Sequence, residues 1–310
     1  MSNHKKIVKA VIPAAGFGTR MLPATKALPK EMLPVATKPL IQFAVEEAAA
    51  AGIETIIIVI RRHKSMVQAH FNRDRELESF LECRQQTAGA ELVRRIEEFA
   101  DLHYVEQEEP RGLAHAISCA RASVGEEPFV VLLPDVIIAA SESATRQLIR
   151  AREEHGGSVV AVREIEPQEM ERHGVVGFRN AADVSLKKSI RLTKLVEKPP
   201  LNDAPSRIGV FGRYLLEPAI WNAIAKTGCD PRGEVQLTQA LHLLCQEYPV
   251  YGFFFEGQHY DAGDQVGFLK ANIELSLRDP LLGQPLREYF SELQSRAAHS
   301  SCTNATCNDN

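Results

Sequence analysis

The stretch that decides the fold is residues 7–20, IVKAVIPAAGFGTR, in which an apolar run leads straight into a loop with two glycines. The run from Ile7 to Pro13 is typical of a buried strand, because it is short, rich in β-branched residues and bounded by a proline and glycine loop. Gly16 and Gly18 leave backbone N–H groups open to an anion, since glycine has no Cβ to block the approach. The stretch therefore predicts a first strand that leads into a phosphate-binding loop.

The spacing of these glycines matches neither of the two best-known phosphate loops. A Walker A loop would require G-x-x-x-x-G-K-[ST], and the dinucleotide fingerprint G-x-G-x-x-G would need a third glycine where Met21 stands. A dinucleotide-dependent oxidoreductase on a doubly wound sheet stays open as an alternative, but the missing third glycine disfavours it.

A local excess of positive charge follows the glycine loop. The basic residues between positions 16 and 40 are Arg20, Lys26, Lys30 and Lys38. Glu31 is the only acid in that interval, whereas the whole chain has a net charge of -4. Because no global positive field exists, we expect neither a nucleic acid nor an anionic membrane as partner. A positive focus beside a glycine loop suits a triphosphate.

Along the chain, strand-like apolar runs alternate with helical patterns, which is typical of βαβ units on a largely parallel sheet. The expected strands are 7–13, 55–60, 129–133, 158–162 and 250–255. The expected helices are 40–51, a charged helical excursion within 75–100, 266–277 and 281–296. The 310 residues, 45% of them hydrophobic, can bury a large core as one large unit or as about two domains.

The remaining sequence features predict a cytoplasmic protein with a disordered C-terminal tail. Residues 297–310 are small, polar and without periodicity, so we expect a disordered tail there. No segment approaches the about 20 apolar residues that cross a bilayer, and no signal-peptide pattern is present. The cysteines, at 83, 119, 229, 245, 302 and 307, form no C-x-x-C pair and no Cys/His cluster, so free thiols are expected.

Two aspartates follow strand-like runs. Asp135 comes just past the strand 129–133, at the edge where open α/β sheets bind ligands, and Asp261 follows the strand 250–255. Two carboxylates together with phosphate oxygens would form a hard-oxygen site for Mg²⁺. A single aspartate after a strand is more often a turn or helix cap, so both interpretations stay open from these residues alone.

Residues 14–26, AAGFGTRMLPATK, and 29–34, PKEMLP, resemble the signature of the bacterial UTP–glucose-1-phosphate uridylyltransferases. The resemblance extends from residue 7 to about 280. It implies an α/β protein with a Rossmann-like, mixed and mostly parallel sheet of the sugar nucleotidyltransferase type. It also implies one nucleotidyltransferase domain over 1–295, with a nucleotide-binding part at roughly 7–140 and a sugar-phosphate part at roughly 141–280.

The implied reaction makes UDP-glucose and pyrophosphate from UTP and glucose 1-phosphate with Mg²⁺, in a homo-oligomer that is a dimer or a tetramer. The resemblance assigns catalytic roles to Arg20, Lys30 and Lys198. It assigns nucleotide binding to Ala15, Gly16, Gly18, Thr19, Glu31, Gln107 and Gly112. It assigns sugar binding to Gly174 and Glu197, and metal binding to Asp135 and Asp261.

The resemblance is incomplete at several of these motifs. His173 stands where relatives have tyrosine, Ala114 where they have glycine, and Ala262 where cysteine is common. Glu197 and Lys198 are neighbours in the chain, so both can face one ligand only if the strand departs from regular pleating, and Pro199-Pro200 favours such an end. We interpret His115 and the segment 233–238 as structural.

Two further alternatives remain open at this point. A catalytically weak paralogue that acts as a regulator is favoured mildly by Ala114 and disfavoured by the intact Gly18-Thr19-Arg20. Thymidylyl transfer, or another sugar 1-phosphate, is the nearest competitor within the enzyme class.

Overall fold

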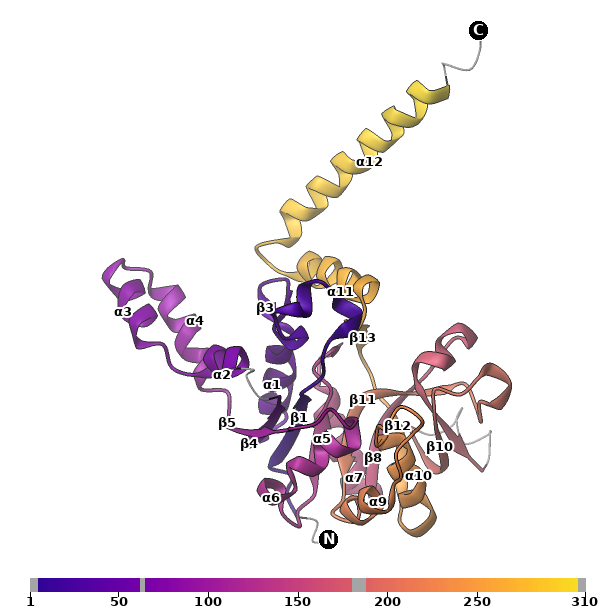
Figure 1. The fold of residues 1–310 in the computed structure, drawn as a ribbon. Helices are drawn as coiled ribbons and strands as arrows, with labels where there is room; N and C mark the ends of the chain where they lie inside the picture. The colour runs from indigo at the N-terminus through magenta and orange to yellow at the C-terminus, as the bar shows by residue number, and fades with distance from the viewer. Residues whose placement is uncertain (1–4, 62–64, 180–187, 306–310) are drawn as a thin grey trace.

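The protein is built on one nine-stranded sheet with helices packed against it (Figure 1). The computed structural model describes residues 5–61, 65–179 and 188–305. Across the sheet the strand order is β5-β4-β1-β6-β11-β8-β12-β10-β9. In chain order these strands are β1 (Lys9–Ala14), β4 (Thr55–Ile60), β5 (Asp101–Glu106), β6 (Phe129–Leu132), β8 (Ser158–Glu164), β9 (Gly174–Phe178), β10 (Ser189–Glu197), β11 (Ile208–Leu216) and β12 (Val250–Phe254).

The sheet is mixed: seven of its nine strands run in the same direction, and four of the pairings between neighbouring strands are parallel. The strands β5, β4, β1 and β6 are parallel to one another, and β8 is parallel to β12. Only β11 and β10 run against the rest, because β11 is antiparallel to β6 and β8 and β10 is antiparallel to β12 and β9. The predicted α/β class is confirmed, and each predicted strand corresponds to an observed one within two residues at either end. The strands β5, β9, β10 and β11 were not predicted.

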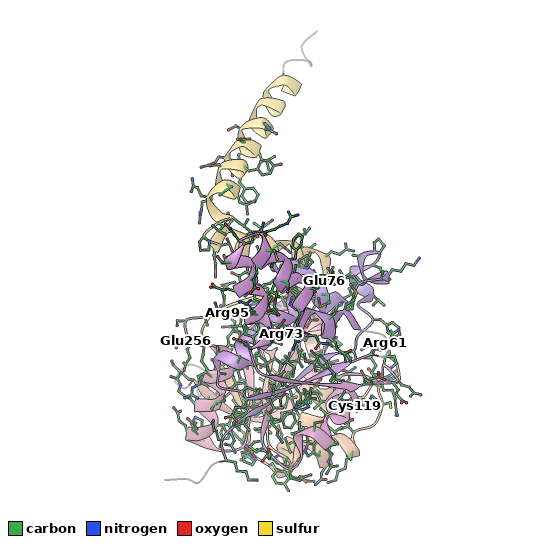
Figure 2. All side chains as sticks on the ribbon, turned by 90° about the vertical axis from the view of Figure 1, so that its left-hand side faces the viewer. Arg61, Arg73, Glu76, Arg95, Cys119 and Glu256 are labelled. Carbon is green, nitrogen blue, oxygen red and sulfur yellow. The ribbon has the colours of Figure 1, made fainter. Side chains whose placement is uncertain are left out.

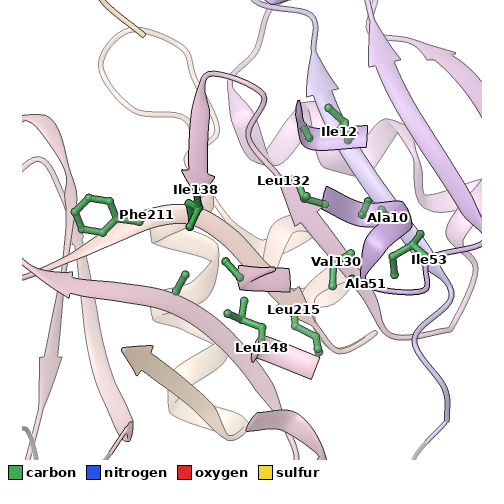
Figure 3. Packing of buried hydrophobic residues seen from close by; sticks show 14 of the residues in the cluster. Ala10, Ile12, Ala51, Ile53, Val130, Leu132, Ile138, Leu148, Phe211 and Leu215 are labelled. Carbon is green, nitrogen blue, oxygen red and sulfur yellow. The ribbon is translucent and has the colours of Figure 1, made fainter. Parts of the chain in front are cut away.

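The core lies on both faces of this sheet. On β1, Ala10 and Ile12 belong to one buried cluster, whereas Val11 between them belongs to the cluster on the opposite face. Figure 3 shows the first cluster, in which Ala10 and Ile12 lie near Val130 and Leu132 of the adjacent strand β6. Burial on both faces explains why the central strands are nearly continuous apolar runs and do not alternate.

All the predicted helices are present, and the last one is longer than predicted. They are α1 (Leu40–Ala50), α2 (Ser65–Phe71), α3 (Arg75–Cys83), α4 (Thr87–Glu97), α5 (Leu113–Cys119), α6 (Arg121–Val124), α7 (Ala144–His155), α9 (Ile220–Lys226), α10 (Leu237–Glu247), α11 (Gln265–Arg278) and α12 (Gly283–Ala305). The last of them, α12, extends away from the body (Figure 1) and continues through 297–305, where we predicted a disordered tail. The rest of that predicted tail, 306–310, lies outside the described residues. None of the described helices is long and apolar enough to cross a membrane.

Several short elements lie between these strands and helices. The 3₁₀ helices are η1 (Thr19–Met21), η2 (Ala24–Lys26), η3 (Lys30–Met32), η4 (Pro167–Arg172) and η5 (Leu201–Asp203). Two small antiparallel pairs join β2 (Pro34–Val35) to β3 (Lys38–Pro39) and β7 (Val136–Ala139) to β13 (Gln258–Asp261). The second pair links the two halves of the chain. Cys83, Cys119, Cys229 and Cys245 are free thiols, as predicted.

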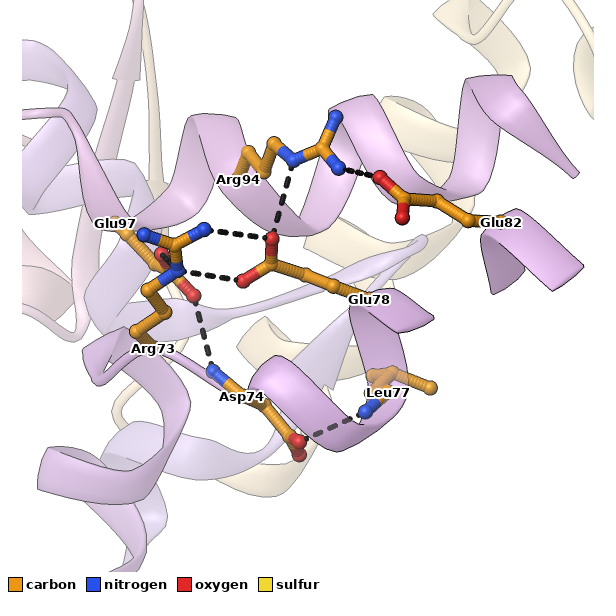
Figure 4. A network of polar contacts seen from close by, with 7 residues as sticks. All are labelled: Arg73, Asp74, Leu77, Glu78, Glu82, Arg94 and Glu97. Carbon is orange, nitrogen blue, oxygen red and sulfur yellow. Dashed lines mark hydrogen bonds and ion pairs between the residues drawn. The ribbon is translucent and has the colours of Figure 1, made fainter. Parts of the chain in front are cut away.

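The predicted helical excursion is a hairpin of α3 and α4 that projects from the sheet (Figure 1). Buried Glu78 accepts hydrogen bonds from Arg73 and Arg94 and holds the two helices together (Figure 4). Hydrogen bonding to Arg73 lowers the pKa of Glu78 to about 2, and Arg94 adds to the effect. The outer surface of the hairpin is charged, and Figure 2 shows Arg73, Glu76 and Arg95 on the side facing the viewer.

Candidate active site

A cleft of about 580 Å³ lies at the carboxyl ends of β5, β1 and β6, where ligands bind in open α/β sheets. The whole set of residues that the resemblance singled out lines this cleft. They are Ala15, Gly16, Gly18, Thr19, Arg20, Lys30, Glu31, Gln107, Gly112, Asp135, Gly174, Glu197, Lys198 and Asp261. Residues from both halves of the chain therefore meet in one place, although they are up to about 250 positions apart in sequence.

The glycine loop is folded tightly against Lys30. Gly18 has φ 67° and ψ 30°, a left-handed conformation that favours glycine, and it starts the turn η1. The hydroxyl of Thr25 donates to the Gly18 carbonyl at 2.7 Å. A Cβ on Gly18 would lie only 3.0 Å from the Cβ of Lys30, so both the backbone angle and the space require glycine there.

Lys30 and Asp135 form an ion pair inside the cleft. The Nζ of Lys30 lies 2.7 Å from Oδ2 of Asp135, and both side chains are more than four-fifths buried. Burial is the largest single effect on Lys30 and lowers its pKa, but the charge and hydrogen bond of Asp135 and the charge of Glu31 together outweigh it, so the pKa lies above its usual value. Burial is also the largest effect on Asp135 and raises its pKa, but the charge and hydrogen bond of Lys30, the charge of Arg20 and a backbone hydrogen bond together lower it below the usual value. Both groups are therefore charged at neutral pH.

The pairing of β7 with β13 brings Asp261 next to Asp135. Asp261 is opposite Val136 in this ladder, and the N–H of Ala262 donates to the carbonyl of Asp135 at 2.8 Å. A Cβ built on Gly263 would lie 2.9 Å from Oδ1 of Asp261 and 3.2 Å from Oδ2 of Asp135. The two carboxylates thus converge on one small region, as the sequence interpretation required.

The donor set at this point matches a hard cation that shares its ligands with a substrate. In the part of the chain that the structure describes, no group of three or more histidine, cysteine, aspartate or glutamate side chains is placed so that it could hold a metal ion by itself. Mg²⁺ is commonly held by one or two carboxylates plus phosphate oxygens and water, and does not need a complete protein cage. Two converging carboxylates in a cleft beside a phosphate loop fit that pattern.

The positive cluster predicted from the sequence divides in the structure. Arg20 lines the cleft, and one of its terminal nitrogens would be 3.4 Å from a Cβ on Gly263, beside both aspartates. Lys26 and Lys38 do not line the cleft. Lys38 instead pairs with Glu46 and lies over the ring of Phe43. The sequence interpretation overestimated the positive charge in the cleft, because Arg20, Lys26, Lys30 and Lys38 lie in four separate short elements, η1, η2, η3 and β3.

At one end of the cleft, Gln107 follows β5 and is 4% exposed. Its side-chain Nε2 donates to Nδ1 of His115 at 2.8 Å and lies 3.4 Å from the carbonyl of Gly112. The loop before α5 is tied to a distant segment, since Ala114 N–H donates to the Val235 carbonyl and Val235 N–H donates to the Arg111 carbonyl. The segment 233–238, which we interpreted as structural, therefore supports this end of the cleft.

At the other end, Glu197 and Lys198 both line the cleft. Lys198 has φ 44°, so the chain leaves regular strand geometry at the end of β10 and the neighbouring side chains share one ligand space, as predicted. Gly174 is opposite Glu197 in the β9–β10 ladder. Thr238, the last residue of the segment 233–238 that we interpreted as structural, donates its hydroxyl to Oε2 of Glu197. A Cβ on Gly174 would be 2.6 Å from Cγ2 of that threonine.

His173, which replaces the tyrosine of the relatives, lines the cleft but is held by the protein. Its ring centroid lies 4.9 Å from that of Phe211, and its Nδ1 is 3.4 Å from the carbonyl of Val210. The side chain therefore contributes packing at this position, where the resemblance left its contact open.

A buried network behind Asp135 was missed by the sequence interpretation. The guanidinium of Arg213, 1% exposed, pairs with Glu47 and donates to the carbonyls of Leu133 and Val136 on either side of Asp135. Glu47 also accepts from the N–H and the hydroxyl of Thr145. Arg213 thus holds the backbone of the loop that carries Asp135. Its sequence signal was a lone arginine inside the apolar run IGVFGRYLL.

Comparison with known proteins agrees with this geometry. The nucleotidyl transferase family model matches residues 9–277. A UTP–glucose-1-phosphate uridylyltransferase 2 from Staphylococcus saprophyticus is 44% identical over 290 residues, which cover 94% of this chain and 99% of that protein. A UTP–glucose-1-phosphate uridylyltransferase from Staphylococcus epidermidis is 43% identical and covers 93% of this chain and 99% of its own length.

Solved structures give the same relationship in three dimensions. A UTP-bound UGPase from Acinetobacter baumannii superimposes with a TM-score of 0.85 at 35% identity, over 93% of this chain and 100% of that one. A UDP-glucose pyrophosphorylase in complex with UDP-glucose gives a TM-score of 0.80 at 34% identity, over 88% and 100%. The chain therefore belongs to the nucleotidyl transferase family, as do the UTP–glucose-1-phosphate uridylyltransferases that it resembles.

Proposed function

We propose that this chain is a UTP–glucose-1-phosphate uridylyltransferase, which condenses UTP and glucose 1-phosphate into UDP-glucose and pyrophosphate. The observation that carries the proposal is that the complete set of residues implied by the resemblance lines one cleft. The names of relatives above 40% identity over nearly the whole chain support the choice of base and sugar. Within the domain 1–295, the part 7–140 would bind the nucleotide and the part 141–280 the sugar phosphate.

The nucleophile in this reaction is a phosphate oxygen of glucose 1-phosphate, which is already ionised at neutral pH. It attacks the α-phosphorus of UTP in line with the departing pyrophosphate, so that no general base is required. The work of the protein is to align two anions that repel each other and to stabilise the charge on the leaving oxygens. A cleft lined with cations, and without any need for a serine or histidine triad, suits this task.

Each charged side chain has a distinct proposed role. Arg20 and Lys30 would neutralise the triphosphate and the leaving pyrophosphate, and Lys198 would hold the sugar phosphate while Glu197 accepts from sugar hydroxyls. Lys30 is paired with Asp135. When UTP binds, the ammonium group of Lys30 would pair with phosphate oxygens instead, and the carboxylate of Asp135 would bind a metal cation. We propose Mg²⁺ as that cation: Asp135 and Asp261 would hold it, and it would supply positive charge that stabilises the phosphate oxygens.

The test is incubation of the purified protein with UTP, glucose 1-phosphate and Mg²⁺, followed by identification of the products. We expect UDP-glucose and pyrophosphate in equal amounts, and the reverse reaction from these two compounds. A protein that folds and binds UTP but releases no pyrophosphate would be a regulator of the kind considered above. We also propose a cytoplasmic location and a homo-oligomer, dimer or tetramer, which cell fractionation and light scattering would test.

A further inference from the structure

We propose that His115 is a positioning residue that fixes the orientation of the Gln107 carboxamide, and that it thereby makes the site prefer uracil to cytosine. The inference rests on the proposed function, in which Gln107 reads the base of the nucleotide. His115 does not line the cleft. It acts on Gln107 through the hydrogen bond between its own Nδ1 and the side-chain amide nitrogen of Gln107.

The contacts define which end of the carboxamide is the nitrogen. Nε2 of Gln107 lies 2.8 Å from Nδ1 of His115 and 3.4 Å from the carbonyl oxygen of Gly112. A carbonyl oxygen can only accept, so the atom facing Gly112 has to be the amide nitrogen. Nδ1 of His115 is then the acceptor of the shorter bond, and the ring carries its proton on Nε2.

This orientation suits only one of the two pyrimidines. With its N–H groups directed at His115 and at the Gly112 carbonyl, Gln107 leaves Oε1 to face the base, where it can accept from N3–H of uracil. Cytosine has an amino donor at position 4 and an acceptor at N3, so it needs the amide turned round. A reversed amide would direct Oε1 at the Gly112 carbonyl. His115 could meet that oxygen only by moving its own proton to Nδ1.

The parts of this device are fixed relative to one another. The backbone N–H of Gln107 donates to the Ile60 carbonyl at 2.8 Å, which anchors the residue to the end of β4. Gly112 has φ 91°, and a Cβ there would lie 2.7 Å from the carbonyl oxygen of Val235, so the loop is packed against the segment 234–235. His115 lies in the first turn of α5, which begins directly after this loop. The backbone positions of Gln107, Gly112 and His115 are therefore set by the sheet, the loop packing and the helix.

The experiment compares three substitutions of His115 that differ mainly in hydrogen bonding. His115→Leu offers no partner to the amide, His115→Asn can accept or donate, and His115→Asp can only accept. For each variant, kcat/KM is measured for UTP and for CTP with glucose 1-phosphate, and the dissociation constants of both nucleotides are measured by calorimetry without the sugar. The quantity to compare is the ratio of kcat/KM for UTP to kcat/KM for CTP, because a general loss of folding or activity lowers both values by the same factor.

We expect His115→Leu to narrow the UTP/CTP ratio by about two- to tenfold, the value of one neutral hydrogen bond. His115→Asn should narrow it less, and His115→Asp should keep the wild-type ratio even if both rates fall. Equal ratios in His115→Leu and wild type would overturn the proposal, and so would a narrowed ratio in His115→Asp.

Gln107→Leu separates this inference from the function on which it rests. If Gln107→Leu narrows the ratio and His115→Leu does not, the base is read by Gln107 without help from His115. If neither variant changes the ratio, Gln107 does not read the base, and the proposed role of that residue fails together with the inference.

Discussion

At the scale of single residues, the proposed chemistry depends on two carboxylates and the cations around them. Asp135 is a proposed metal ligand and also the counter-ion of Lys30. Burial raises the pKa of Asp135, but Lys30, Arg20 and a backbone hydrogen bond together lower it below the usual value, so the carboxylate is charged at neutral pH. The resting ion pair keeps two buried charges compensated until substrate phosphates arrive.

Asp135→Asn should lower kcat by at least about a hundredfold, because it removes one negative ligand from the proposed metal site with little change in volume. Pyrophosphate release across a Mg²⁺ titration measures the effect, and circular dichroism should report a folded protein. Asp101→Asn is the matched control, since Asp101 is exposed at the opposite end of β5 and outside the cleft. Near-normal turnover of Asp135→Asn would reject the metal assignment.

Lys198→Ala should raise KM for glucose 1-phosphate about tenfold or more and lower kcat, because the ammonium both binds that phosphate and offsets its repulsion by UTP. The affinity for UTP, measured by calorimetry, should change little. Lys194→Ala serves as control, because Lys194 is an exposed lysine of the same strand that does not line the cleft. Loss of UTP binding with sugar-phosphate binding retained would assign Lys198 to the wrong substrate.

Base selectivity should depend on pH through His115. Burial lowers the pKa of His115 below its usual 6.5, and Arg111 adds to this while Glu109 opposes it. The ring is therefore neutral at pH 7 and above, where Nδ1 can accept from Gln107. Protonation in acid places a proton on Nδ1, removes the acceptor and favours the reversed amide.

The UTP/CTP ratio of kcat/KM should accordingly be constant from neutral to alkaline pH and fall in acid, at a pH below the usual histidine pKa of 6.5. The same ratio in His115→Asn should not vary with pH, which separates His115 from other titrating groups. A wild-type ratio that is flat across the acid range would show that this ring does not orient the amide.

At the scale of elements, the loop between β6 and β7 is held from behind by the buried pair of Arg213 and Glu47. Arg213→Met should destabilise the protein by about 3–5 kcal/mol, because it leaves the carboxylate of Glu47 buried without its counter-ion. Urea unfolding measures the change. Lys6→Met, which breaks an exposed pair with Glu54, should cost less than about 1 kcal/mol. A cost for Arg213→Met as small as that of the control would contradict the network's structural role.

The sequence predicted the strands that are short uninterrupted apolar runs and missed those that contain polar residues or glycine. β1, β4 and β6 are buried on both faces, so each is a short apolar run. β5 reads DLHYVE with partial exposure along its length, and β11 contains two glycines and Arg213 within an otherwise apolar run. Neither pattern is recognisable as a strand from the sequence alone. β5 lies at the edge of the sheet, and β11 lies between β6 and β8 and is antiparallel to both.

The cleft-lining residues were predictable from short motifs, but their supporting partners were not. Thr238 reaches Glu197 from 41 positions away, and Arg213 reaches Glu47 from 166 positions away. No local pattern marks such pairs, since they depend on which helices and strands the fold places side by side. For Lys26 and Lys38 the sequence interpretation predicted a place in the cleft that they do not have. They are close to the glycine loop in sequence, but they do not line the cleft.

At the scale of the whole molecule, the small β7–β13 pair explains why one cleft can serve two substrates. The loop after β6 carries Asp135, and β13 returns from the far half of the chain with Asp261. The nucleotide end, with Gln107 and the glycine loop, and the sugar end, with Glu197 and Lys198, therefore meet at the two aspartates. The arrangement predicts that both substrates bind at once and react directly.

The most direct measurement is the comparison of kcat/KM for UTP, CTP, ATP, GTP and deoxythymidine triphosphate, each with glucose 1-phosphate and with galactose 1-phosphate in the presence of Mg²⁺. The proposed function predicts that UTP with glucose 1-phosphate is the best pair and that its product is UDP-glucose, with one pyrophosphate released for each. A clear preference for another nucleotide or another sugar phosphate, or no nucleotide sugar from any pair with a folded protein, would contradict it.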